Sequence, residues 1–368
     1  MKSINRREAL LTLSSATSAM LLGGVTKAAE QTTPRTRMGI VTYAFGIHQK
    51  NQWAGRHQGL TPPLSLLEEA HDLGAAGIQT EIRTQDSAQA VELRRRAESY
   101  GMYIEASVTI PKSADDVDRF EADVHLAQTA GATLARTVIM PGRRYEQFKS
   151  FDEFRQAEKQ GLQSLQRAEP VVAKNRFRLA VENHKDQRIP EKLATIRGLG
   201  SEYIGLCVDV GNSFTLLEDS LDVAKAYAPY AFTVHFKDQA VRESPEGFWF
   251  ADVPMGEGFL DLPAIIKVLR DAKPDVHLNL ELITRDPLSV PVLKDEFWAT
   301  MPDSNARELA RVLRVVKSRS SQKPFVNVTE LPVDQQLTLE SSNVSGSLAY
   351  ARDRLGLAAG KNVEALKR

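Results

Sequence analysis

The sequence contains only one cysteine, Cys207, among its 368 residues, so no disulfide can form within the chain. It also lacks an excess of either charge, because 47 Lys and Arg residues balance 47 Asp and Glu residues. Without a basic field, the chain has no electrostatic signature of nucleic-acid binding, and no nucleic-acid partner is expected. Glycine-rich phosphate loops of the GxGxxG or Walker type are absent as well, which removes the main signal for a nucleotide cofactor.

The bulk composition is that of an ordinary globular protein. Hydrophobic residues make up 42% and charged residues 26% of the chain, which are typical values for a folded domain. The length fits one (β/α)8 barrel of roughly 250 residues with terminal extensions. It is short for two large domains.

The first 28 residues have the layout of a secretory signal. Lys2, Arg6 and Arg7 precede an apolar run from Ala9 to Val25, and small residues follow it. The segment around the arginine pair, NRREAL, resembles a twin-arginine export signal. We expect residues 1–28 to be removed, residues 29–36 to form a linker, and the protein to be periplasmic or otherwise extracytoplasmic.

An uncleaved membrane anchor is the alternative interpretation of this segment. The run from Ala9 to Val25 is shorter than the roughly 20 residues that a helix needs to cross a bilayer. Cleavage is therefore favoured, and no membrane span is expected in the mature chain. Because the twin-arginine route carries folded proteins, it also gives a hint of a metal that is loaded before export.

From residue 37 the sequence alternates between short apolar runs and helical segments. The predicted strands are Met38–Tyr43, Gly77–Ile82, Met102–Ser107, Thr133–Ile139, Phe177–Glu182, Ile204–Asp209, Ala231–Phe236 and Val276–Glu281. The predicted helices are Leu64–Gly74, Ser87–Tyr100, Ala114–Ala130, Phe151–Lys174, Pro190–Leu199, Leu221–Ala228, Leu262–Ala272 and Asn305–Ser318. Alternation of this kind predicts a parallel sheet.

Eight strands are the number that closes into a (β/α)8 TIM barrel, which we place at residues 37–320. A doubly wound open sheet is the competing fold, but it usually has fewer strands and often a glycine-rich turn after the first. Residues 321–368 fall outside the repeat and form a C-terminal extension, with a loop at Pro324–Gln336 and a short helix at Ala349–Leu355. We expect this extension to pack against the barrel or against a neighbouring subunit in a homo-oligomer.

Four consecutive predicted strands end in residues that can bind a metal. These are Glu182, Asp209, His235 and Glu281. Each alone has an ordinary explanation as a solvated or ion-paired residue, but the carboxyl ends of barrel strands meet at one rim. Three carboxylates crowded there would repel one another unless a cation lay between them. The donor set suits Mn²⁺, Mg²⁺, Co²⁺ or Zn²⁺, and the lack of thiolates argues against a structural zinc site.

The segments around these residues make the chain similar to a known superfamily. The matching pieces are Leu179–His184, Cys207–Asn212, Thr233–Asp238, Pro254–Asp261 and Leu278–Glu281. In this order and spacing, over residues 37–320, they resemble the xylose isomerase-like TIM barrels. That group includes sugar phosphate isomerases and epimerases as well as endonuclease IV.

The resemblance implies one divalent metal, with Mn²⁺ as the first choice, held by Glu182, Asp209, His235 and Glu281. It also implies that Glu182 and Glu281 are catalytic. In the epimerases of the family the two glutamates face opposite sides of a substrate carbon, where one removes a proton and the other returns it. The metal polarises the adjacent carbonyl and stabilises an enediolate.

Three positions depart from the patterns of related enzymes. Asn212 and Lys237 stand where endonuclease IV-like enzymes carry histidine ligands, so a trinuclear zinc cluster and DNA repair are not expected. Arg188 stands where the ketose epimerases have an acid, so their substrate contacts need not carry over.

Further polar and aromatic residues near the rim are candidates for substrate contacts. His184, Asn212 and Lys237 are assigned to substrate binding, although Lys237 pairing with Asp238 and His184 pairing with Asp186 are equally weighted alternatives. The acids at positions 81 and 105 are interpreted as structural. The long segment from residue 239 to 260 is expected to be a loop. Its residues Phe248–Phe250 either form a lid over a sugar, pack in the core or make an oligomer contact. The glycines at 256 and 258 allow a sharp turn there.

Three hypotheses for function follow. The first is a metal-dependent sugar or polyol isomerase or epimerase that transfers a proton α to a metal-bound carbonyl. The second is a lyase or hydratase acting on 3-keto-glycosides or related oxidised sugars. The third is a carbohydrate-binding barrel without catalysis, which the intact four-ligand set disfavours. All three take a small carbohydrate as their partner.

Overall fold

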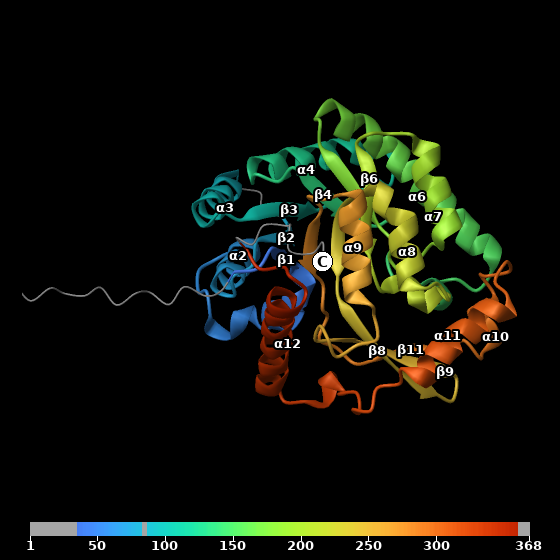
Figure 1. Ribbon diagram of the computed structural model, residues 1–368. Helices are drawn as coiled ribbons and strands as arrows, with labels where there is room; N and C mark the ends of the chain where they lie inside the picture. Colours follow the sequence, from blue (N-terminus) through green and yellow to red (C-terminus); the bar gives the residue numbers. More distant parts are fainter. Residues whose placement is uncertain (1–34, 83–86, 360–368) are drawn as a thin grey trace, which may run out of the picture. The chain divides into compact units, whose positions relative to one another are not determined.

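The computed structural model describes residues 35–82 and 87–359 and contains a closed barrel of eight parallel strands (Figure 1). The predicted (β/α)8 fold is confirmed. The strands are β1 (Met38–Val41), β2 (Gly77–Glu81), β3 (Tyr103–Ser107), β4 (Leu134–Thr137), β5 (Arg178–Glu182), β6 (Ile204–Asp209), β7 (Ala231–Phe236) and β10 (His277–Leu280). Around the ring each strand pairs with its sequence neighbour, and β10 closes the barrel against β1. The proposed export signal lies outside the described residues, so export stays a prediction.

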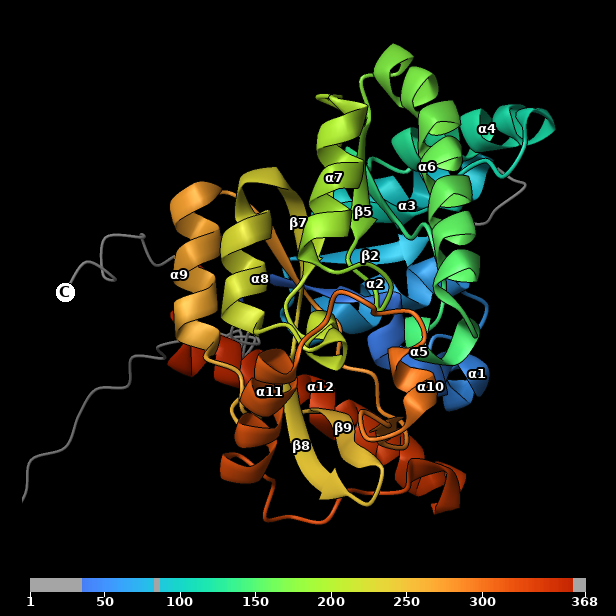
Figure 2. The same cartoon turned by 90° about the vertical axis from the view of Figure 1, so that its right-hand side faces the viewer.

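The major helices lie outside the ring of strands (Figures 1 and 2). They are α2 (Pro62–Asp72), α3 (Ser87–Tyr100), α4 (Val117–Thr129), α6 (Phe151–Lys174), α7 (Ile189–Leu199), α8 (Ser220–Tyr227), α9 (Leu262–Ala272) and α11 (Ala306–Ser318). Shorter helices are α1 (Gly46–Lys50), α5 (Arg144–Gln147) and α10 (Asp295–Trp298). Side-chain caps fix several helix starts, as Ser150 does for α6 and Asp219 for α8.

The pairing register determines which side chains point into the barrel. Parallel pairing aligns Gln79 with Glu105, Ser107 with Arg136, and Asp209 with His235. Aligned residues of neighbouring strands share a face of the sheet, and every second residue of each strand shares it too. The interior of this barrel is therefore polar along much of its axis, while the opposite face of the strands packs against the helices in the main apolar core.

A second, three-stranded sheet corrects the predicted long loop after β7. Strands β8 (Asp238–Ser244) and β9 (Gly247–Val253) form an antiparallel hairpin, and β11 (Leu288–Val290) pairs with β9. Phe248 and Phe250 are buried in a second apolar cluster, so the core-packing alternative is correct for these two rings, and Trp249 is 39% exposed. The segment GFWFADV is rich in aromatic residues, which favour strands, so the predicted loop is wrong here.

The C-terminal extension is also more regular than predicted. In place of a short helix at 349–355, the structure has a long helix, α12 (Val333–Arg354). Its buried Glu340 accepts hydrogen bonds from the backbone N–H groups of Ile47 and His48 and pairs with the His48 ring. The expectation that this segment packs against the barrel is thus confirmed. The small sheet and helices α10–α12 lie toward the same end of the barrel in both views (Figures 1 and 2).

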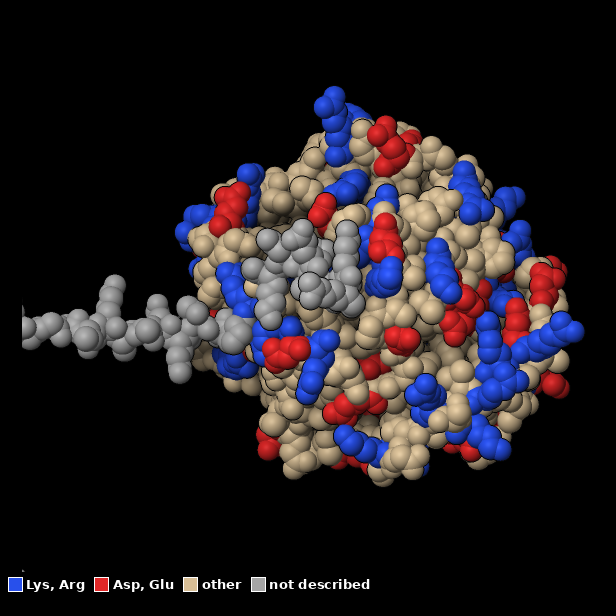
Figure 3. Space-filling view, viewed as in Figure 1, with Lys and Arg blue, Asp and Glu red and all other residues tan. Residues whose placement is uncertain are grey.

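The surface of the described chain carries mixed charge. Figure 3 shows basic and acidic side chains interspersed over one face. Among the described residues, no helix combines the length and apolar character needed to cross a bilayer.

Candidate metal centre

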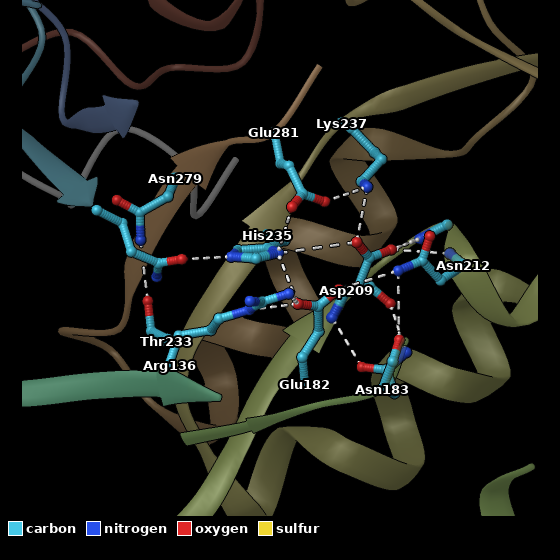
Figure 4. A network of polar contacts seen from close by, with 12 residues as sticks. Arg136, Glu182, Asn183, Asp209, Asn212, Thr233, His235, Lys237, Asn279 and Glu281 are labelled. Atoms are coloured by element: carbon cyan, nitrogen blue, oxygen red, sulfur yellow. Dashed lines mark hydrogen bonds and ion pairs between the residues drawn. The ribbon is translucent and has the colours of Figure 1, made fainter. Parts of the chain in front are cut away.

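The four predicted ligands meet at the carboxyl ends of β5, β6, β7 and β10 (Figure 4). One potential ligand atom from each of Glu182, Asp209, His235 and Glu281 lies within 4.8 Å of the others. The side chains of Glu182, Asp209 and His235 are fully buried, and that of Glu281 is nearly so. We call these four residues the ligand cluster. Strands distant in sequence thus bring together three carboxylates and one imidazole in a site sheltered from water.

The orientation of the His235 ring is fixed by Gln79. Its Nε2 lies 2.6 Å from Oε1 of Gln79, and the Nε2 amide group of Gln79 donates to Glu105 at 2.9 Å. Because the amide oxygen of Gln79 must accept, Nε2 of His235 carries a proton. Its Nδ1 is therefore the ring atom that faces the cluster, 3.2 Å from Glu281 and 3.5 Å from Glu182, and it would offer a lone pair to a cation when the ring is neutral.

Glu105 anchors this arrangement as a fully satisfied buried carboxylate. Besides Gln79, it accepts hydrogen bonds from Thr233 at 2.8 Å and Asn279 at 3.0 Å, and it pairs with His277 at 2.8 Å. We call Gln79, Glu105, Thr233 and Asn279 the supporting network. The prediction that Glu105 is structural fits these contacts. Because Glu105 binds Gln79, and Gln79 binds His235, it also helps to orient the imidazole ring.

Two atoms of the ligand cluster point to a divalent cation. Nδ1 of His235 is buried and has no hydrogen-bond partner among the described residues, and the buried Oδ2 of Asp209 has an ion pair with Nζ of Lys237 at 2.7 Å as its contact. These two atoms lie 4.0 Å apart, and two more carboxylates face the same space. Buried polar atoms normally find partners, and a cation with oxygen and imidazole ligands would bind both at once. The residues present therefore fit a metal site.

Two basic residues also contact the cluster. The guanidinium group of Arg136 binds Glu182 with its Nε at 2.6 Å, and Nζ of Lys237 lies 2.7 Å from Asp209 and 2.5 Å from Glu281. Burial alone would raise the pKa of Glu182, but Arg136 and His235 outweigh burial and hold this pKa well below its usual range. The cluster therefore has both like-charge repulsion and fixed positive partners.

Asp209 has the opposite electrostatic balance. Burial is the largest cause of its raised pKa, Lys237 offsets part of it, and repulsion from Glu281 and Glu182 adds to it. The result is a pKa of about 6. Asp209 is the ligand whose charge costs most, and it is the one that a bound cation would stabilise most.

Of the three predicted substrate-binding residues, two lie at the ligand cluster and one lies away from it. Lys237 lies in the cluster and pairs with Asp209 and Glu281, so the alternative pairing with Asp238 is wrong. Asn212 is also at the cluster, because its backbone N–H donates to Asp209 at 2.8 Å and its amide donates to Glu182 at 3.2 Å.

His184 lies farther out at the rim. Its Nδ1 contacts the carbonyl of Gly142 at 2.9 Å, and the acid at 186 pairs instead with Lys192 at 3.0 Å. The alternative pairing of His184 with that acid is therefore wrong.

Asp238 has a structural role that explains the nearby glycines. Its carboxylate accepts the backbone N–H groups of Gly256 at 2.9 Å and Gly258 at 3.0 Å. A Cβ atom at Gly258 would overlap this carboxylate, and Gly256 has a φ of +88°. The predicted sharp turn is confirmed, and Asp238 holds it in place beside the rim.

Sequence reasoning missed Arg136 and Gln79. Each occupies an inward position on a barrel strand, β4 and β2 respectively. A polar or charged residue in phase with the inward face of a barrel strand is the signal that would have found them.

Comparison with solved structures supports the same architecture. L-ribulose 3-epimerase aligns with a TM-score of 0.53 and 15% identity, covering 88% of this chain and 99% of that one. A D-psicose 3-epimerase studied in the presence of D-fructose aligns with a TM-score of 0.51 and 14% identity, covering 79% and 92%. A probable 3-DHS dehydratase from Bacillus anthracis has a TM-score of 0.51 and 15% identity, covering 77% and 99%.

Sequence comparison finds a curated relative and a family. The relative is 3-oxo-isoapionate decarboxylase of Pectobacterium atrosepticum, 23% identical over 250 residues, which are 66% of this chain and 84% of that protein. The model of the family described as xylose isomerase-like TIM barrel matches residues 67–315. The match spans more than half of the chain and includes all four residues of the ligand cluster. This protein is a member of the xylose isomerase-like TIM barrel family.

Proposed function

We propose that the protein is a metal-dependent isomerase or epimerase that transfers a proton at the carbon next to a carbonyl group of a sugar or polyol. The observation that carries this proposal is the ligand cluster, in which three carboxylates and Nδ1 of His235, an atom without a hydrogen-bond partner among the described residues, are directed into one buried space. Mn²⁺ is the preferred metal, with Mg²⁺, Co²⁺ or Zn²⁺ as alternatives. When bound, the cation would act as a Lewis acid that polarises the carbonyl.

The residues of the cluster would divide the remaining work. Glu182 and Glu281 come from β5 and from the end of β10, and both face the space where a substrate carbon would lie. One would accept the proton and the other would return it. The ammonium group of Lys237, 2.5 Å from Glu281, is placed to stabilise negative charge that develops on a substrate oxygen.

A second candidate is a lyase or hydratase acting on an oxidised sugar, such as a 3-keto-glycoside. The basic partners of both glutamates favour it, because Arg136 beside Glu182 and Lys237 beside Glu281, each with His235, outweigh burial and lower the pKa, and so the basicity, of both carboxylates. An epimerase needs two bases, one on each face of the substrate carbon. Elimination or decarboxylation breaks a bond next to the carbonyl and needs no second base on the opposite face. The curated relative is named as a decarboxylase and one structural neighbour as a probable dehydratase, which adds support.

The test measures metal content and solvent exchange together. We expect the purified mature protein to retain a divalent metal and, with 3-oxo-glucose in heavy water, to incorporate deuterium at the carbon next to the carbonyl. Exchange without loss of any substituent supports the isomerase or epimerase. Loss of a substituent from the neighbouring carbon supports the lyase. A protein that takes up no Mn²⁺, Co²⁺ or Zn²⁺ when these are supplied would refute both.

A further inference from the structure

A cavity of about 400 Å³ lies between the rim of the barrel and the C-terminal extension. Its lining comes from residues 43–51 after β1, residues 283–285 after β10, and residues 328–340 of the extension. Its volume falls within the roughly 300–1,000 Å³ of pockets that bind small molecules. The first and third of these segments lie outside residues 67–315, which match the family model. Most of the cavity is therefore built from parts of the chain that the family match does not include.

The cavity adjoins the ligand cluster. Ile283 lines it and stands two positions after Glu281 in the chain. Tyr43 lines it as well, and the guanidinium carbon of Arg136, which binds Glu182, lies 5.8 Å from the centroid of the Tyr43 ring. Burial is the main cause of the raised pKa of Tyr43, and the charges of Glu281 and Glu182 add to it. A sugar held at the cluster could thus extend a substituent past Tyr43 into the cavity.

The walls of the cavity offer mainly apolar side chains to a ligand. They are Tyr43, Ile47, Ile283, Val328 and Val333, of which Val333 is 50% exposed. Apolar walls are the usual lining of a small-molecule site. An apolar group that entered the cavity would be removed from water together with these side chains, which is favourable.

Most polar side chains of the lining are already bound to the protein. Both carboxylate oxygens of Glu340 are occupied by the backbone N–H groups of Ile47 and His48 and by the His48 ring. Four further polar residues form side-chain hydrogen bonds of 2.6–3.0 Å within the protein, namely Asn51, Thr284, Thr329 and Gln336. These groups have little left to offer to the hydroxyl groups of a ligand.

The two basic residues of the lining differ in their partners. Nη2 of Arg285 lies 3.3 Å from Oδ2 of the buried Asp252, which balances its charge. Lys50 has no acid partner among the described residues, but it is exposed, so water can solvate its ammonium group. A paired guanidinium group can still stack on an aromatic face, and the ring of Tyr43 can pack against another ring. Arg285 and Tyr43 therefore favour an aromatic ligand among apolar ones.

We propose that the cavity binds an aromatic group attached to the sugar, so that the substrate is a glycoside with an aromatic aglycone. This inference rests on the proposed function for the position of the sugar at the ligand cluster. It assigns the C-terminal extension a role in substrate specificity, because Val328 and Val333 of the extension form one wall of the aglycone site.

The test compares pairs of glycosides that carry no carbonyl group to be processed. Binding of methyl and phenyl glucosides, in both anomeric forms, to the Mn²⁺-loaded protein is measured by isothermal titration calorimetry. For at least one anomer, the phenyl glucoside should bind about tenfold more tightly than the methyl glucoside, because the cavity buries the ring.

Two variants act on different walls of the cavity, and each should remove most of this preference. Gly46 lines the cavity, has a helical φ of −61°, and a Cβ atom there would meet nothing within 4 Å. Gly46→Leu should therefore narrow the cavity without backbone strain. Val333→Asp places a charge in the apolar wall. Val333 is the first residue of α12, where an acid is compatible with the helix dipole, so the fold should be retained.

Gly198→Leu is the matched control for the first variant. Gly198 lies in helix α7, a Cβ atom there also meets nothing within 4 Å, and the residue does not line the cavity. This variant should keep the parent's preference. Circular dichroism and metal content show whether each variant remains folded and loaded.

Equal affinity for the methyl and phenyl members of both pairs in the parent would overturn the aglycone site. So would a preference that is unchanged in both Gly46→Leu and Val333→Asp. Tighter binding of a 4-carboxyphenyl glucoside than of the phenyl glucoside would also overturn it, since Lys50 or Arg285 would then select an anion.

Failure of the proposed function has a different signature. A protein that exchanges no proton of 3-oxo-glucose, yet prefers phenyl glucoside in a manner dependent on Gly46 and Val333, retains the aglycone site and loses the isomerase or lyase assignment. Proton exchange without any preference for the phenyl glucoside retains the proposed function and overturns the aglycone site.

Discussion

The barrel interior holds buried carboxylates in two adjacent layers that differ in how their charge is satisfied. In the supporting network, Glu105 accepts hydrogen bonds from Gln79, Thr233 and Asn279 and pairs with His277, so its oxygens are occupied. In the ligand cluster directly above it, three carboxylates share one space, Lys237 is ion-paired with two of them, and Nδ1 of His235 has no hydrogen-bond partner among the described residues.

The partners of a buried carboxylate therefore distinguish a structural acid from a candidate metal ligand in the same barrel. A carboxylate surrounded by neutral donors is already stable and holds its neighbours in place. Carboxylates that face one another retain an electrostatic cost that a cation can remove. Burial alone does not discriminate, since Glu105 and Glu182 are both almost fully buried.

The largest expected effect comes from removing a member of the ligand cluster. His235→Ala and Glu281→Gln should each lower bound metal from about one ion per chain to a small fraction, because each deletes one ligand. Elemental analysis of folded protein measures this. Glu218→Gln, which alters a buried carboxylate outside the cluster, should retain the metal. Full retention in His235→Ala would contradict the assignment.

Replacing Lys237 should affect turnover but not metal binding. Lys237→Gln should keep the metal and lower kcat by about 10²–10³-fold, the usual cost of losing one group that stabilises developing negative charge. Steady-state kinetics on whichever 3-oxo sugar shows exchange, with metal content measured in parallel, provides the check. An unchanged kcat would leave Lys237 only as a partner of Asp209 and Glu281.

The supporting network should have a smaller effect, acting through His235. In Glu105→Gln, the new amide can donate to Gln79 and turn its amide group over, which would force the opposite tautomer on His235. Metal affinity should fall about 10–100-fold, as for other residues that orient a ligand. Competition with a metal chelator gives the affinity, and nitrogen NMR of the imidazole gives the tautomer. A lower affinity with an unchanged tautomer would assign Glu105 a merely structural role.

Glu218 extends the comparison to a buried carboxylate with no metal-binding role, and its effect on the metal should be the smallest. Burial raises its pKa to about 7, although the backbone N–H of Ile189 donates to it. The folded state therefore holds this proton more tightly than the unfolded state does. Its stabilising contribution is complete below the ordinary pKa of 4.5 and is lost as pH rises toward 7, a change of about 3 kcal/mol.

Denaturant unfolding at several pH values tests this sign. Between pH 4.5 and 7 the parent should lose stability relative to Glu218→Gln, in which no proton is released. Parallel pH profiles of the two proteins would show that Glu218 is not the group responsible.

The sequence alone determined the barrel and its ligand cluster. Local apolar periodicity and helix-ending glycines placed all eight strands. Four residues, Glu182, Asp209, His235 and Glu281, were recognisable because each lies at or beside the carboxyl end of a buried strand, and these ends meet at one rim. These features depend on local pattern and on a topology that leaves few choices.

Only the tertiary structure decided how the site is supported. Gln79 and Arg136 contact cluster residues more than 40 positions away in sequence, and nothing local to them specifies which partner they meet. Glu105 acts on His235 only through its contact with Gln79. The tertiary structure likewise decides the state of the buried hydroxyl groups of Ser107 and Thr137, since a hydroxyl group without a hydrogen-bond partner exists only once its surroundings are fixed. Local patterns encode which elements form, whereas the pairing of inward side chains depends on the register and closure of the whole barrel.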